Sequence, residues 1–103
     1  MRCAVLSLLA LSACHPRWVL VDVHSAGAPV VDATVSAVCQ PLGSAADRSD
    51  PGGAVALAIP ELRASVCTVT ASREGLRTAR REGVVTCRDR ARCTPVEFEL
   101  EAR

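Results

Sequence analysis

The 103-residue chain has room for one domain, and its composition limits what that domain can be. Half of the residues are apolar but only 2% are aromatic, so valine, leucine and alanine have to build the core. Twelve basic residues face eleven acidic ones, and the excess arginine is Arg2; from Cys14 onward the charges balance, which removes the electrostatic basis for nucleic-acid binding. Six cysteines in so short a chain indicate an oxidising compartment.

The first thirteen residues have the layout of a short export signal. Arg2 supplies one positive charge, and the following run from Cys3 to Leu11 is apolar apart from Ser7. This run is much shorter than the ~20 residues that a membrane-spanning helix needs. The sequence therefore predicts a cleavable signal peptide over residues 1–13.

The end of this leader, Leu11-Ser12-Ala13-Cys14, resembles the lipobox of bacterial lipoproteins, in which small residues precede the lipidated cysteine. The resemblance implies cleavage before Cys14, a diacylglyceryl thioether on its sulfur, acylation of the freed amine, and a lipidated tether over residues 14–17. Two or three acyl chains give stable membrane anchorage. His15 after the cysteine favours the outer membrane, by analogy with enterobacterial sorting. The alternative is an ordinary secretory signal with Cys14 in a disulfide.

From Trp18 onward, apolar and polar residues alternate with a period of two, which is typical of strands with one buried face. Residues 40–53 are predicted to form a long polar loop, and Leu76–Glu82 an exposed edge strand in preference to a helical turn. The last two strands are predicted to form a hairpin. The expected strands are Trp18–His24, Ala33–Cys39, Ala54–Ile59, Val66–Ser72, Leu76–Glu82, Val84–Cys87 and Thr94–Leu100. Seven short strands predict an all-β sandwich.

Three segments, each of which combines a turn with a strand, carry a further resemblance: Gly27–Val35, Asp50–Leu57 and Val69–Leu76. Their order is similar to that of the carboxypeptidase regulatory-like domain, a transthyretin-like, Ig-like β-sandwich common in bacterial envelope proteins. The resemblance spans Trp18 to Leu100 and implies one such domain over residues 18–103. It specifies architecture rather than chemistry.

The four cysteines that remain after Cys14 form an even set. Cys39 and Cys67 point inward from strands that such a sandwich can bring together, so we pair them. Cys87 then pairs with Cys93 across the predicted final hairpin. A zinc site that includes His15 or His24 is the competing interpretation, but the close pair is spaced C-x5-C and exported thiols are oxidised before they bind metal.

Few residues qualify as catalytic groups. His24 lies two residues from Asp22 on the polar side of its strand, which can orient an imidazole, but no nucleophile is obviously placed beside it. Two segments qualify as binding surfaces: the loop with Arg88, Arg90 and Arg92, whose guanidinium groups suit carboxylates or phosphates, and the Leu42–Gly53 loop.

We therefore expect a monomeric, non-enzymatic envelope lipoprotein without metal or cofactor. Its partner would be a protein, a peptide or a glycan. The alternative functions are a small periplasmic hydrolase or metal-dependent enzyme that uses His24, and a lipid-free secreted adaptor.

Overall fold

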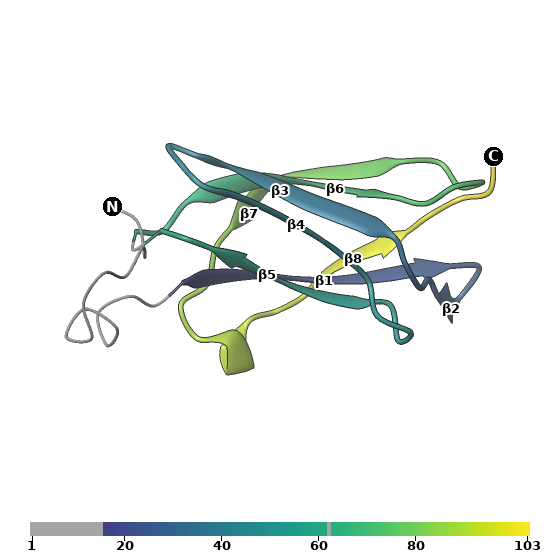
Figure 1. Ribbon diagram of the computed structural model, residues 1–103, viewed down its shortest axis with the longest axis horizontal. Coiled ribbons are helices and arrows are strands. Elements are labelled where there is room, and N and C mark those ends of the chain that lie inside the picture. The colour runs from purple at the N-terminus through teal and green to yellow at the C-terminus, as the bar shows by residue number, and fades with distance from the viewer. Residues whose placement is uncertain (1–15, 62) are drawn as a thin grey trace.

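Two four-stranded β-sheets face each other in the computed structural model, which describes residues 16–61 and 63–103 (Figure 1). The predicted signal peptide and Cys14 lie outside the described residues. The first sheet contains β1 (Arg17–Ser25), β2 (Ala28–Pro29), β5 (Ala54–Ile59) and β8 (Val96–Glu99). The second sheet has the order β4 (Ser44–Arg48), β3 (Thr34–Gln40), β6 (Val66–Ser72) and β7 (Ala79–Val85).

Strand β1 is the centre of the first sheet. It pairs antiparallel with β5 along Arg17–Asp22 and parallel with β8 along Val21–His24. Its valines at positions 19, 21 and 23 are buried, whereas the residues between them are half-buried. The alternation read from the sequence therefore sets which face of β1 meets the opposite sheet.

The second sheet is organised around the antiparallel pair β3 and β6. Cys39 lies directly opposite Cys67 in this register, and the two form a disulfide. The bond thus joins neighbouring strands of one sheet rather than the two layers of the sandwich. Both cysteines are buried, so their sulfur atoms also belong to the core.

The core between the sheets is built almost entirely from small aliphatic side chains. Phe98 is the aromatic residue within it, and Leu57, Ile59 and Leu100 are its largest aliphatic members. The remaining buried hydrophobic residues are Val19, Val21, Val23, Ala33, Val35, Ala37, Cys39, Val55, Cys67, Val69 and Ala71. Packing of such short side chains requires the two sheets to approach closely along their whole length.

The segment predicted as a long polar loop, residues 40–53, contains a strand, and that prediction was wrong. β4 occupies Ser44–Arg48 and pairs with β3 at the edge of the second sheet. Its side chains are exposed except for the half-buried Ala45, so no apolar alternation marks it in the sequence. Gly43, which has a positive φ of 106°, permits the tight turn that returns the chain from β3.

The predicted final hairpin was also wrong. Val84 and Val85 end β7 in the second sheet, whereas β8 lies in the first sheet and pairs parallel with β1. The chain from residue 86 to residue 95 therefore crosses from one layer to the other. The parallel pairing of β8 with the distant β1 decides where β8 lies. The assumption that consecutive strands pair with each other does not predict this position.

The all-β sandwich and both predicted disulfide pairings are confirmed. The described residues form eight strands, one of which has two residues, instead of the seven expected, because β2 and β4 are additional and the single strand β7 replaces the expected Leu76–Glu82 and Val84–Cys87. β7 is an edge strand, although it begins at Ala79 rather than at Leu76. Phe98 and Leu100 point inward, with Glu97, Glu99 and Glu101 exposed.

The two disulfides are expected to differ in their contribution to stability. Cys39 and Cys67 are separated by 28 positions and Cys87 and Cys93 by 6, which on the loop-entropy relation corresponds to about 3.6 and about 2.4 kcal/mol. Replacing the first pair by alanine also removes buried sulfur. Urea unfolding should therefore show a larger loss for Cys39→Ala/Cys67→Ala than for Cys87→Ala/Cys93→Ala. Equal losses would contradict the structural role assigned to the first bond.

Candidate binding surface around the second disulfide

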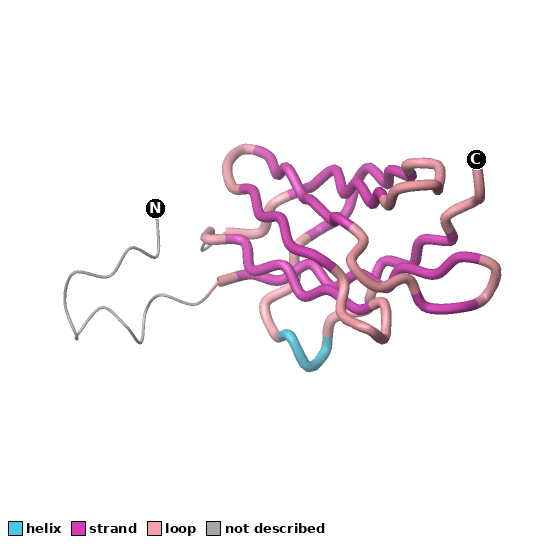
Figure 2. The backbone as a smooth tube through the Cα atoms, turned by 45° about the vertical axis from the view of Figure 1, so that its right-hand side comes forward, coloured by secondary structure: helices cyan, strands magenta, loops and turns pink. Residues whose placement is uncertain are grey.

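The crossing segment between β7 and β8 is held in shape by the Cys87–Cys93 disulfide. It contains the short 3₁₀ helix η2 (Arg90–Arg92), the cyan element in Figure 2. The carboxylate of Asp89 accepts a hydrogen bond from the amide of Ala91 at 3.0 Å and so caps this helix. We call residues 87–93 the disulfide loop.

The disulfide loop is attached directly to the start of β1. The amide of Trp18 donates to the carbonyl oxygen of Cys87 at 2.8 Å, and the amide of Cys87 donates to the carbonyl oxygen of Trp18 at 2.9 Å. This reciprocal pair fixes one end of the loop against a central strand. The second cysteine of the disulfide holds the other end.

Arg90 lies over the indole ring of Trp18, with its guanidinium carbon 4.9 Å from the ring centroid. A cation at this distance is attracted by the negative face of the ring, and the contact orders the arginine side chain over the outer face of β1. A shallow groove of about 190 Å³ begins beside Arg90 and is lined by Asp22, Ala56 and Pro95, among others. The groove places two opposite charges, Arg90 and Asp22, on one surface.

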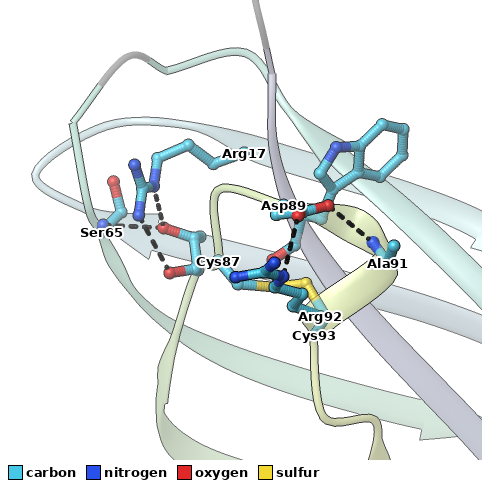
Figure 3. Close-up of a disulfide and its surroundings, with 9 residues drawn as sticks. Arg17, Ser65, Cys87, Asp89, Ala91, Arg92 and Cys93 are labelled. Carbon is cyan, nitrogen blue, oxygen red and sulfur yellow. Dashed lines mark hydrogen bonds and ion pairs between the residues drawn. A yellow bond between two sulfur atoms is a disulfide. The ribbon is translucent and has the colours of Figure 1, made fainter.

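The buried Thr86 anchors the base of the loop. Figure 3 shows Arg17 and Ser65 beside the disulfide between Cys87 and Cys93. The hydroxyl oxygen of Thr86 accepts hydrogen bonds from Nε of Arg17 and from the amide of Ser65, each at 3.0 Å. The amide of Thr86 donates in turn to the carbonyl oxygen of Ser65 at 3.0 Å. Three segments distant in the sequence therefore meet at this residue.

The three arginines predicted as an anion-binding tip do not act as one group. Arg90 stacks on Trp18, and Nε of Arg92 lies 3.6 Å from a carboxylate oxygen of Asp89. Arg88 is exposed at the start of the loop. All three side chains remain at the surface, but each has a different environment. The loop also lies on the flank of the sandwich rather than at the tip of a hairpin.

The arginines of β7 have partners outside the disulfide loop. Arg80 forms an ion pair with Glu82 at 2.5 Å, and Arg81 donates to the carbonyl oxygen of Glu97 at 3.1 Å. The guanidinium carbon of Arg81 also lies 5.7 Å from the ring centroid of Phe98. The side chain of Arg81 therefore lies along β8 at the edge of the core.

The proposed catalytic pair, His24 and Asp22, lies on β1 with both side chains half-buried. The nearest hydroxyl group on the strand, that of Ser25, donates to the carbonyl oxygen of Leu100 at 2.7 Å. Within residues 16–61 and 63–103, no three His, Cys, Asp or Glu side chains gather in a way that could hold a metal ion.

A second groove lies at the far end of the molecule. It has a volume of about 340 Å³ and is lined by charged side chains from several turns, including Arg73, Glu74 and Arg103. Asp32 and Arg48 also face it and lie 4.0 Å apart. No local pattern marks this groove, because its residues come from four separate segments. Of the predicted Leu42–Gly53 binding segment, it includes only Arg48.

The disulfide loop and Trp18, on which it packs, together form the disulfide loop surface. The sequence alone did not assign Trp18 a role in it. The one available signal was that Trp18 is the sole tryptophan of the chain. Its role can be recognised only once its pairing with Cys87 is known. Comparisons with protein-family models, with curated proteins and with solved structures found no match. No helix in the described part of the chain is long and apolar enough to cross a membrane.

The contact between Arg90 and Trp18 is directly measurable, because Trp18 is the sole tryptophan. Arg90→Gln should change the emission spectrum of Trp18, since it removes a cation from the ring face, while the free energy of unfolding falls by less than about 1 kcal/mol. Arg92→Gln is the matched control, because its partner is Asp89. Identical spectra for the two variants would show that Arg90 does not stack on the ring in solution.

Proposed function

We propose that this protein is a non-enzymatic, lipid-anchored envelope module that binds a partner through the disulfide loop surface. The anchor is the thioether-linked lipid on Cys14, and the folded part is a carboxypeptidase regulatory-like sandwich. In a bacterial cell it is attached to the outer membrane. Its partner is a protein, a peptide or a glycan that carries carboxylate or phosphate groups.

The position of the first strand supports the anchor. β1 begins at Arg17, so only His15 and Pro16 separate the proposed lipidated cysteine from a central strand of the sandwich. Cleavage before Cys14 would remove only residues that lie outside the described part of the chain.

The disulfide loop carries the binding proposal. A binding site on a rigid scaffold loses less conformational entropy on association than a mobile one does. Here a disulfide, an aspartate cap and a reciprocal backbone pair with Trp18 fix the loop, while Arg88, Arg90 and Arg92 remain exposed. Guanidinium groups on a fixed loop are suited to bidentate bonds with carboxylates and phosphates.

The anchor is tested by mass spectrometry of the protein purified from bacterial membranes. The expected mass lacks residues 1–13 and includes a diacylglyceryl group and an acyl chain on Cys14. Cys14→Ser should carry neither lipid nor cleavage at this site. A native protein with an intact leader, or one cleaved without lipid, would contradict the anchor.

Binding is tested by capture of envelope components on the native lipidated protein. The variant Arg88→Gln/Arg90→Gln/Arg92→Gln should lose at least about tenfold in affinity, since each charge-assisted hydrogen bond contributes about 1.5 kcal/mol or more. Arg73→Gln/Arg77→Gln/Arg80→Gln removes the same charge elsewhere and should bind normally. A hydrolase that depends on His24 would instead lose its activity in His24→Ala, a substitution that leaves the proposed binding intact.

A further inference from the structure

One end of the sandwich collects the apolar side chains that the core does not cover. Among the described residues, five large hydrophobic side chains are exposed, and four of them lie at this end: Val38, Leu42, Val66 and Val85, with exposed fractions of 49% to 60%. The fifth, Val31, precedes β3 at the opposite end. A cluster of this kind on a small domain marks a contact surface.

The strand register brings these four side chains together. Val85 lies opposite Val66 between β7 and β6, and Val66 lies opposite Gln40 at the end of β3. Val38 is two residues from Gln40 on the same outward face, and Leu42 lies in the turn that follows. That turn also borders a groove of about 420 Å³ that Pro41 and Pro60 help to line. We call this region the tether end.

The chain enters the sandwich at this same end. Arg17, the first residue of β1, pairs with Ile59, the last residue of β5. Figure 1 shows the start of β1, the end of β5 and the β3–β4 turn at one end of the molecule, with the C-terminus at the other. Arg17 also bonds to Thr86, the residue that follows Val85. The apolar cluster therefore lies at the end of the sandwich where the chain enters the fold, on the outer face of the second sheet.

The tether is too short to hold this end away from a membrane. Three peptide units separate Cys14 from Arg17, and fully extended they span at most about 11 Å. The lipid on Cys14 is inserted in the bilayer, so Arg17 lies within this distance of the headgroup region. Trp18 follows immediately, and tryptophan favours the boundary between acyl chains and water.

Charged side chains are also distributed unevenly between the tether end and the rest of the molecule. Two arginines (17 and 63) and one carboxylate (Glu61) belong to the described segments at the tether end, residues 16–18, 38–44, 59–61, 63–66, 85 and 86. The other described residues carry nine arginines and ten carboxylates. The described residues, which are neutral as a whole, thus present a small net positive charge toward the proposed anchor. Anionic phospholipids attract such a surface.

From these observations we infer that the tether end docks on the anionic bilayer that holds the lipid of Cys14, with Leu42 and its neighbouring valines in the headgroup boundary. Arg17 and Arg63 at this end face the phosphates, whereas the disulfide loop, on the flank of the sandwich, stays open to its partner. The inference rests on the proposed anchor. It extends that proposal, because it fixes the orientation of the sandwich and directs the charged groove at the far end away from the membrane.

Hydrogen exchange of the native lipidated protein in phosphatidylglycerol-containing vesicles tests this orientation. Water reaches the surface of a domain that is tethered but not docked, so closeness to the bilayer alone does not slow exchange. Docking should slow the amides of residues 42–44 and 85–88 about threefold or more relative to the same amides in Leu42→Ser/Val85→Thr. Val31→Ser is the matched control and should resemble the native protein.

Each result has a defined meaning. Equal exchange in the native protein and in Leu42→Ser/Val85→Thr overturns the inference while a lipid mass on Cys14 leaves the proposed anchor standing. A chain without that lipid mass overturns the anchor, and the orientation with it. Protection that increases with protein density at constant lipid indicates contact with a second copy and also overturns the inference. Protection that weakens in phosphatidylcholine vesicles or at high salt supports the role of the arginines.

Discussion

Two sheets meet across a core that contains one aromatic side chain and otherwise valine, alanine, a few larger aliphatic residues and two cysteines. Small side chains bury little apolar area each, so packing alone gives a domain of this size a small margin of stability. The Cys39–Cys67 bond joins β3 to β6 within one sheet, where it removes conformational freedom from the unfolded chain and adds buried sulfur to the core. The pairing of the layers depends on that sheet being intact.

The first sheet is held by different means. β1 pairs with three strands and additionally with Cys87, so segments from the beginning, the middle and the end of the described chain converge on it. The same strand carries Trp18 under Arg90 and presents Arg17 to Thr86. The strand that follows the tether thus organises both the fold and the proposed binding surface. The proposed anchor, so close to a central strand, would couple the orientation of the whole domain to its attachment point.

The two ends of the sandwich have different chemistry. Exposed valines, Leu42 and Arg17 lie at the end where β1 starts, whereas the opposite end carries the charged groove with Arg73, Glu74 and Arg103. The proposed docking would place the apolar and cationic groups of the first end against a bilayer, where such groups are stabilised.

The local pattern of apolar and polar residues determined much of the strand structure of this protein. Alternation over Val19–Val23 and Ala33–Cys39 fixed which side chains face the core, because side chains along a strand point to opposite faces in turn, and the inward cysteines identified the first disulfide. β4 escaped detection because an exposed edge strand needs no apolar period, and β8 was misplaced because its partner lies more than seventy residues earlier. The stacking of Arg90 on Trp18 and the gathering of exposed valines at one end likewise depend on pairings between distant segments. Those pairings form only when the two complete sheets pack against each other. A short stretch of sequence therefore cannot determine them.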